Sequence, residues 1–245
     1  MENNDIKVIR LDETDSTHRY LNDYHGEEGR LFTVVRADYQ REGHGQGDNY
    51  WESERGRNLT FSVKFYPQRI LVSHRYALQQ AGALAVCDAL CHYGEGFTIK
   101  WPNDIYWHDY KVSGTLSTCS IAGRYVTDCI LGIGINVNQL SFRSDAPNPL
   151  SLARVTGHEV SLDEVFGLFI GRLEYWLSRL DAADLQSVGR AYHDRMYRRQ
   201  GCHWYEDADG PFEAYIEGVA PDGLLLLRDV EGHERRYEFK QIKFI

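Results

Sequence analysis

The sequence predicts an α+β protein in which a larger domain of mixed elements carries a small all-β domain at its C-terminal end. In the first four fifths of the chain, segments that alternate like strands are interspersed with segments of helical periodicity. After Gly201 only short alternating segments remain, divided by glycines. The length of 245 residues suits one domain of ordinary size with a small addition, so we expect domains at 1–198 and 199–245.

The N-terminal part predicts a helix, two strands and a long loop. Asp, Ser and Thr at 15–17 are residue types that cap helices, so a helix should begin there. Strands are expected at 31–37 (LFTVVRA) and at 59–65 (LTFSVKF), where alternation of apolar and polar residues is typical of a half-buried strand. The glycine-rich stretch between them, QREGHGQGDNYW at 40–51, is too long for a tight hairpin and is a candidate functional loop.

The middle of the chain predicts helices with recognisable ends. Ser73 can cap a helix that runs to Tyr93, where Gly94 follows as a stop. Ser161 and Glu164 form a capping box at the start of another helix. The other expected elements are strands at 97–101, 104–107, 112–121 and 124–138 and helices ending near Leu180 and covering 183–199.

The C-terminal segments FEAYIEGVA, GLLLLRDV and RRYEFKQIKFI are short alternating stretches. Short strands must hide their edges, so we expect them to form a barrel-like module.

Composition excludes several classes of protein. The chain has no apolar run of the roughly 20 residues that a membrane helix needs, and its polar, acidic first residues do not resemble a signal peptide. The five cysteines form no CxxC pair, and Cys87 and Cys91 fall in an apolar stretch, so we expect buried thiols in a reducing cytoplasm and no metal site. The net charge of −9 and the absence of a basic run argue against a nucleic-acid partner.

Lysine is scarce, with only six among 27 basic residues. The chain therefore does not use lysine as general surface charge. Lys100 and Lys111, which flank one short segment, need individual explanations.

Two stretches carry side chains that could act on a ligand. In KWPNDIYWHDYKVSGTL, at 100–116, a proline turn fixes Asn103 and Asp104, and Lys111 could neutralise developing negative charge. An ordinary turn and a solvated lysine are the alternatives. The helix start at 15–17 could seat a carboxylate or a polar ring on its unpaired N–H groups, although simple capping explains the same residues.

A third stretch, LGIGINVNQ at 131–139, interrupts an apolar strand with Gly132 and Gly134, which would allow something to approach the backbone closely. Asn136 and Asn138 share a face, and either amide could bond to a purine edge. A bulged core strand is the alternative. The chain lacks a GxSxG nucleophile motif, a P-loop and zinc-ligand spacing of its histidines.

Together these motifs resemble those of the biotin protein ligases. Their order and spacing match the catalytic domain of that family over roughly residues 7–195, and the C-terminal module resembles its SH3-like domain. The motifs are DST at 15–17, YQ…GxG…W at 39–51, KWPND at 100–104, KVSG at 111–114 and GIGINVN at 132–138.

The resemblance implies a mixed-sheet catalytic domain with an SH3-like β-barrel and two half-reactions in one site. Biotin's carboxylate would attack the α-phosphate of ATP, carried with Mg²⁺, to give biotinyl-5′-AMP and pyrophosphate. A lysine of a biotin carboxyl carrier protein would then take the biotin. Because the first step joins two anions, the site must supply positive charge and oriented N–H donors. No prosthetic group or protein-held metal is implied.

The resemblance also assigns roles to residues of this chain. Lys111, Asp104 and His44 would serve the chemistry, with the loop covering the junction of biotin and phosphate. The residues implied for biotin are Ser16, Thr17, His18, Gln40, Gly43, His44, Gly45, Gln46, Lys111 and Gly114. Those implied for ATP or the adenylate are Trp51, Asn103, Lys111, Gly132 and Asn136.

Several positions depart from the family pattern. The loop usually reads G-R-G, but its middle residue here is His44, and Gln46 and Gly47 stand where many members have further arginines. His18 and Thr118 replace a common asparagine and a frequent glutamate. A neutral histidine lacks the fixed fork of arginine donors, so we expect His44 to donate one hydrogen bond and Arg41 or Lys111 to offset the lost charge.

Two other functions share this pattern. A lipoate or octanoate ligase would have the same fold, and a degenerate biotin-binding paralogue would hold ligand without turnover. The chain begins almost directly on the catalytic motifs, which predicts a ligase without repressor activity. A homodimer is left open, and the resemblance does not identify the carrier protein.

Overall fold

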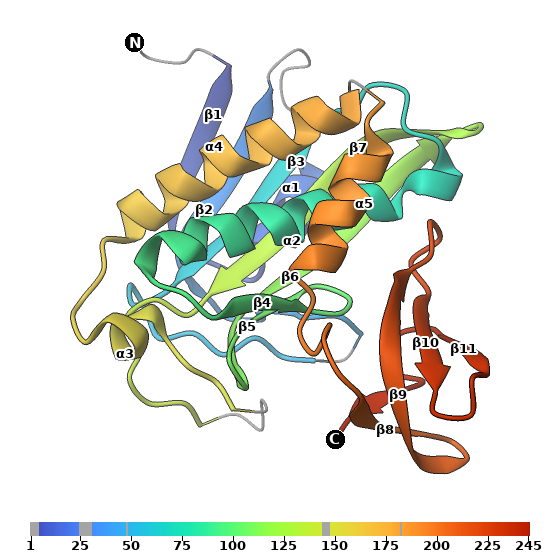
Figure 1. Cartoon of the computed structure of the whole chain (residues 1–245). Coiled ribbons are helices and arrows are strands. Elements are labelled where there is room, and N and C mark those ends of the chain that lie inside the picture. The colour runs from blue at the N-terminus through green and yellow to red at the C-terminus, as the bar shows by residue number, and fades with distance from the viewer. Residues whose placement is uncertain (1–4, 25–30, 48, 144–147, 182) are drawn as a thin grey trace.

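The computed structural model describes residues 5–24, 31–47, 49–143, 148–181 and 183–245, which form two β-sheets with helices packed on the larger one (Figure 1). The larger sheet has seven strands in the order β1-β2-β3-β7-β6-β5-β4. β1 and β2 run parallel and the other neighbours run antiparallel, so the predicted α+β class with a mixed sheet is confirmed. The strands are β1 (Ile6–Thr14), β2 (Phe32–Gln40), β3 (Leu59–Phe65), β4 (Phe97–Lys100), β5 (Asp104–Trp107), β6 (Tyr110–Ala122) and β7 (Tyr125–Ile135).

The helices form unequal layers on the two faces of this sheet. α2, α4 and α5 cover one face, and α1 packs on the other against β2, β3 and β7 (Figure 1). The core lies mainly between the sheet and the larger helical layer, where the ring of Phe61 meets that of Phe169 edge to face at 5.1 Å. The helices are α1 (Thr17–Asp23), α2 (Tyr76–Leu90), α3 (Leu152–Thr156), α4 (Leu162–Asp181) and α5 (Leu185–Asp194), and short 3₁₀ helices cover Val72–His74 and Cys91–Tyr93.

Strand β3 has the predicted bounds but not the predicted half-burial. All its residues except Lys64 are buried. The polar side chains are buried because α1 covers their face of the sheet, and they are satisfied there: Thr60 donates to the Ala37 carbonyl at 2.8 Å, and Ser62 bonds to Thr17 at 2.9 Å. The alternation therefore marks a strand with one polar side buried under a helix.

The helix expected from Ser73 is shorter than predicted. Ser73 lies inside a 3₁₀ turn, and α2 begins after Arg75 without a side-chain cap. Cys87 is buried as expected, but Cys91 is exposed because α2 ends one residue before it. The capping box at the start of α4 is present, since the Glu164 N–H donates to Ser161 at 3.3 Å.

Three further differences concern short or polar elements. β1 was not predicted, although Ile9 and Leu11 alternate with the exposed Arg10 and Asp12, and neither was the five-residue α3. The helix predicted at 183–199 is confined to α5, capped by Asp184.

A second sheet of five antiparallel strands, in the order β11-β10-β9-β8-β12, forms the C-terminal module. This sheet is consistent with the SH3-like module that the sequence predicted, and among the strands that the structure describes β11 and β12 do not pair, so it is not closed into a barrel. The module contacts the larger domain beside α5, and Trp101 donates from Nε1 to the Gly223 carbonyl at 3.0 Å. Its strands are β8 (His203–Asp207), β9 (Gly210–Val219), β10 (Leu225–Asp229), β11 (Glu234–Tyr237) and β12 (Lys243–Phe244). The domain boundary at 198/199 remains a prediction.

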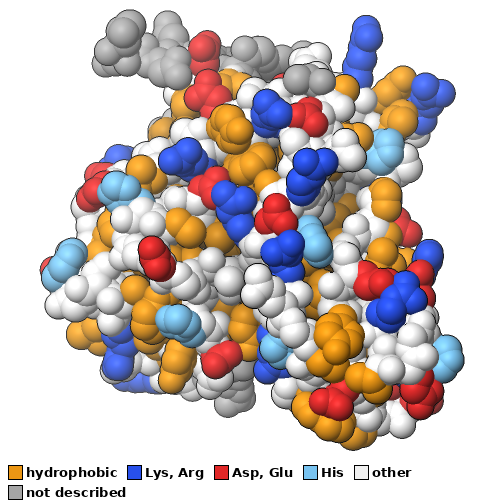
Figure 2. All heavy atoms as spheres, in the orientation of Figure 1, with side chains coloured by type: hydrophobic (Ala, Val, Ile, Leu, Met, Phe, Trp, Pro, Cys, Tyr) orange, Lys and Arg blue, Asp and Glu red, His pale blue; other side chains and the backbone are white. Residues whose placement is uncertain are grey.

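Charges of both signs are interspersed on the face shown in Figure 2. In the described part of the chain, no helix combines the length and apolar character needed to cross a membrane.

Candidate functional site

A cavity of about 100 Å³ lies over the middle of the larger sheet, covered by the glycine-rich loop. It contains every residue predicted for the site except Gly43 and Asn136. Its lining also includes residues that the sequence analysis did not select. The lining is Ser16, Thr17, His18, Gln40, His44, Gly45, Gln46, Asn49, Tyr50, Trp51, Phe61, Ser62, Asn103, Asp104, Lys111, Gly114, Thr115, Leu116, Gly132, Ile133, Gly134 and Phe239.

A cluster of buried hydroxyl and amide groups forms one side of the cavity. Gln40, at the end of β2, accepts at Oε1 from both the Thr17 N–H (2.8 Å) and the Thr17 hydroxyl (2.9 Å). The Thr17 hydroxyl also lies 2.9 Å from that of Ser62 on β3. Ser16 caps α1 by accepting from the Arg19 N–H at 3.4 Å. The cluster thus fixes the rotamers of these groups and presents donors and acceptors to a polar ring.

His18 and Thr118, two positions that depart from the family pattern, contact each other. The His18 Nε2 lies 3.0 Å from the Thr118 hydroxyl. A side chain at Gly132 would begin 3.1 Å from His18 Cδ2, so the glycine leaves room for the imidazole. Burial lowers the pKa of His18, opposed by a hydrogen bond with the Ile130 backbone. The ring is therefore neutral at pH 7.

Lys111 and Asp104 form an ion pair in the cavity. The Lys111 Nζ lies 2.7 Å from Asp104 Oδ2, and both side chains are about three quarters shielded, with 21% and 26% exposed. Asp104 begins β5 opposite Gly114 of β6. A Cβ at Gly114 would lie 3.2 Å from Asp104 Oδ1, so glycine is needed there to keep the carboxylate beside the lysine.

The turn that carries Asp104 is held by Asn103. Its amide nitrogen donates to the Thr115 carbonyl, while the Thr115 hydroxyl donates back to the Asn103 carbonyl at 2.8 Å. Asn103 therefore has a structural partner as well as a place in the lining. Lys100, the other lysine of this segment, packs its ammonium 4.7 Å from the ring centre of Tyr106 and 5.3 Å from that of Phe244.

Trp51 lies flat against the sheet because two strands carry glycine below it. A Cβ on Gly134 would lie 2.3 Å from Trp51 Cε2, and one on Gly114 would lie 3.4 Å from Cζ3. The Trp51 Nε1 and the Asn136 Oδ1 are both buried, and neither has a hydrogen-bond partner among the residues that the structure describes. Asn138 is satisfied, since it exchanges two hydrogen bonds with the backbone of Val160. A free donor and a free acceptor are thus buried close to the stretch 131–139, as a nucleobase would require.

The loop folds back on itself as a small hairpin. His44 bridges Tyr50, and the Trp51 N–H donates to the Gly43 carbonyl at 2.9 Å. Gly43 lies beneath Trp51 and outside the cavity lining. His44 Nδ1 bonds to the Glu42 carbonyl, which can only accept, so this nitrogen carries the proton and Nε2 is an acceptor in the neutral ring. Protonation of His44 is then needed before it can donate from Nε2.

Ser62 and Phe239 are the main residues that sequence reasoning missed. Ser62 had a signal, because a serine on the polar side of an alternating strand requires a partner if that side is buried. Phe239 had none, because it comes from the C-terminal module and its position depends on how the two sheets pack.

The described residues contain no group of three or more His, Cys, Asp or Glu side chains arranged to hold a metal ion.

The fold and this cavity define a class of protein that matches known families. The family model described as the biotin/lipoate A/B protein ligase family matches residues 11–136. A bifunctional ligase/repressor BirA of Bacillus spizizenii is 32% identical over 243 residues, which cover 94% of this chain and 72% of that protein. The chain therefore belongs to the biotin/lipoate A/B protein ligase family.

Two other similar proteins bear the names of biotin ligases. A biotin–[acetyl-CoA-carboxylase] ligase of Paracoccus denitrificans is 27% identical over 232 residues, covering 91% of this chain and 95% of that protein. The biotin protein ligase of Aquifex aeolicus, solved in complex with biotin and ATP, superposes with a TM-score of 0.78 at 25% identity and covers 98% of both chains.

Proposed function

We propose that this protein is an ATP-dependent biotin protein ligase, which makes biotinyl-5′-AMP and transfers biotin to a lysine of a biotin carboxyl carrier protein. The observation that carries the proposal is the pairing, in one cavity, of a neutral polar cluster with a lysine–carboxylate pair. The similar proteins named as biotin ligases support the same assignment.

The neutral side of the cavity suits the ureido ring of biotin. A ureido group has one carbonyl acceptor and two N–H donors, and Ser16, Thr17 and Gln40 offer both kinds of partner. None of these side chains carries a charge, which suits an uncharged ring. His18 is also neutral, because its burial lowers its pKa, and so it suits the same uncharged ring.

The Lys111 side of the cavity suits the reacting carboxylate and phosphate. A carboxylate oxygen of biotin attacks the α-phosphorus of ATP, the bond to the bridging oxygen breaks, and the electron pair leaves with pyrophosphate. The Lys111 ammonium would offset the negative charge that accumulates as the two anions meet. Asp104 would orient the ammonium through their ion pair. The second step would release AMP when a carrier lysine attacks the mixed anhydride.

ATP would bind with Trp51 and Asn136 near its base and bring Mg²⁺ on its phosphates as part of the substrate. The buried, unpartnered Trp51 Nε1 and Asn136 Oδ1 fit the acceptor and donor edges of adenine. A volume of about 100 Å³ is below the roughly 300 Å³ of small ligand sites. The hairpin, described at 43–47 and 49–51, must therefore lift to admit the substrates, and its closure would then keep water from the anhydride.

The experiment is biotin transfer to a purified biotin carboxyl carrier protein in the presence of Mg²⁺-ATP, detected with streptavidin. We expect the Lys111→Gln variant to lose transfer and the Lys64→Gln variant, whose lysine faces Asp128 outside the cavity, to keep it. A wild-type protein that leaves the carrier unmodified would refute the proposed function.

A further inference from the structure

The hairpin that covers the cavity is poor in positive charge. Residues 42–51 contain neither lysine nor arginine. The neighbouring Arg41 donates to Asp15 at 2.7 Å and to Glu13 at 3.1 Å, and Lys111 faces Asp104. Both cations that the sequence suggested for offsetting the charge, Arg41 and Lys111, are thus already paired with carboxylates, and a triphosphate entering under the hairpin would use a further cation.

Lys240 of the C-terminal module lies directly against the hairpin. Its Nζ is 2.7 Å from the point that a Cβ on Gly47 would occupy, and its Cε is 3.4 Å from the same point. Any side chain at position 47 would displace the ammonium, and Gly47 also has a φ of +67°, which favours glycine. The missing side chain of the hairpin thus leaves space that a lysine from another domain fills.

Lys240 also stands apart from the other lysines of the chain. In the described structure it has neither an ion pair nor a side-chain hydrogen bond, although it is exposed and close to backbone of the loop. Each of the other five has a polar partner: Lys7 with Tyr24, Lys64 with Asp128, Lys100 with Tyr106, Lys111 with Asp104 and Lys243 with Glu206.

The turn that carries Lys240 is held in place on both sides. The Glu238 N–H donates to Gln241 Oε1 at 2.7 Å and closes the turn. Phe239 lines the cavity, and its ring centre lies 6.5 Å from that of Trp101. Lys240 itself adopts a φ of +70°, which a non-glycine residue rarely takes, so the turn fixes the position of its backbone.

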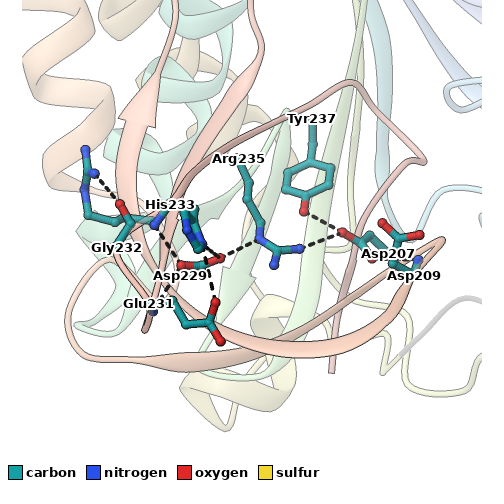
Figure 3. A network of polar contacts seen from close by, with 9 residues as sticks. Asp207, Asp209, Asp229, Glu231, Gly232, His233, Arg235 and Tyr237 are labelled. Atoms are coloured by element: carbon teal, nitrogen blue, oxygen red, sulfur yellow. Dashed lines mark hydrogen bonds and ion pairs between the residues drawn. The ribbon is translucent and has the colours of Figure 1, made fainter.

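A polar network braces the strand that leads into this turn (Figure 3). The Tyr237 hydroxyl donates to Asp207 at 2.6 Å, and Arg235 donates to Asp229 at 2.9 Å and lies 3.4 Å from Asp207. The His233 N–H donates to Asp229, and with Arg235 it lowers the pKa of that carboxyl to about 2. Asp229 is therefore ionised throughout the neutral range, and the network anchors β11 two residues before Phe239.

We propose that Lys240 is a substrate-binding residue contributed by the C-terminal module, which binds the phosphate chain of ATP at the edge of the hairpin. The inference rests on the proposed ligase function. As the carboxylate oxygen bonds to the α-phosphorus and the bond to pyrophosphate breaks, negative charge accumulates on the leaving group. The Lys240 ammonium offsets that charge from the solvent side, while Lys111 acts inside the cavity.

The test compares three variants of the full chain by their KM for Mg²⁺-ATP in biotinyl-AMP formation. Lys240→Gln should raise this KM about tenfold, equivalent to about 1.4 kcal/mol, while the Kd for biotin stays unchanged. Lys240→Arg should stay within about twofold of wild type, because it keeps the charge. Lys243→Gln, on the same module and paired with Glu206, is the matched control and should behave as wild type. Urea unfolding of each variant shows whether folding is intact.

A KM for Mg²⁺-ATP in Lys240→Gln that equals wild type would overturn the inference, as would an equal loss in Lys240→Arg. A wild-type protein that forms no biotinyl-AMP would instead refute the ligase function. The Lys240 inference is then decided by calorimetric binding of Mg²⁺-ATP and of inorganic pyrophosphate. Tighter binding to wild type than to Lys240→Gln supports it, and equal or absent binding overturns it.

Discussion

Gly134→Ala places a methyl group in the surface on which the Trp51 indole lies, and should therefore change both the stability of the protein and its KM for ATP. The added methyl would lie 2.3 Å from Trp51 Cε2 and 2.6 Å from Nε1. Nonbonded carbon atoms approach to about 3.5–4.0 Å, so the indole must retreat by more than about 1 Å. The contact is to a ring pinned by the hairpin, and it cannot be relieved by a flexible chain end.

Overpacking of this kind costs about 1–3 kcal/mol, and the replaced glycine returns up to about 1 kcal/mol by restricting the unfolded chain. We therefore expect Gly134→Ala to lower the free energy of unfolding by about 1–2 kcal/mol. The displaced indole should also raise the KM for ATP about tenfold. The assays are urea unfolding and the ATP dependence of biotinyl-AMP formation.

Gly171→Ala is the matched control. Gly171 lies on the exposed side of α4, and a Cβ there would meet nothing within 4 Å. This variant should gain about 0.5–1 kcal/mol from helix propensity and keep the wild-type KM. If Gly134→Ala keeps both the wild-type stability and the wild-type KM, the placement of Trp51 on Gly134 is wrong.

The remaining predictions concern the polar side of the cavity and the hairpin. Ser62→Ala should lower the free energy of unfolding by about 1 kcal/mol and weaken biotin binding in calorimetry, because Thr17 loses a buried partner. Ser178→Ala, at an exposed position of α4, should change neither quantity. A biotin affinity of Ser62→Ala equal to that of wild type would contradict this prediction. His18 has a lowered pKa in the folded protein, so the unfolded chain binds more protons below its ordinary value of 6.5 and stability should fall as pH falls through that region. The His18→Asn variant should lose less unfolding free energy than wild type over the same pH range. The loss that remains should come from His193, whose pKa is also lowered by burial. A pH dependence of stability equal to that of wild type would show that His18 does not cause the loss. His44→Arg should slow the release of biotinyl-AMP several-fold, because a fixed positive charge replaces a ring whose Nδ1 already bonds to the Glu42 carbonyl. Release at the wild-type rate in a filter assay would exclude a role of His44 in retaining the adenylate.

The sequence predicted the parts of the fold that depend on local patterns. β3 to β7 follow alternation and turn residues, and the start of α4 follows from the capping box at Ser161. β1 was missed because the adjacent apolar residues Val8 and Ile9 interrupt its alternation, which continues only from Ile9 to Asp12. Ser73 failed as a cap because a 3₁₀ turn, fixed by backbone pairing of residues 71 and 125, precedes α2.

The sequence predicted most of the residues that line the cavity, but it did not predict Ser62, Phe239 or the contacts between the lining residues. The sequence motifs selected Thr17, Gln40, Asp104 and Lys111, and all four line one cavity. Each lies at or next to the end of a helix or strand, and these ends meet at the sheet. The roles of the site residues remain predictions. Lys240 could not have been selected, because its place against Gly47 depends on how the C-terminal module packs on the rest of the chain.

The proposed biotin ligase activity is tested directly by mass spectrometry of the acyl-adenylate that forms when the protein is incubated with Mg²⁺-ATP, biotin and lipoate, the two acids at equal concentration. Biotinyl-AMP without lipoyl-AMP is the predicted result, because the Thr17–Gln40–Ser62 cluster offers polar partners that a ureido ring uses and a dithiolane ring does not. Lipoyl-AMP as the main product, or no adenylate at all, would contradict it.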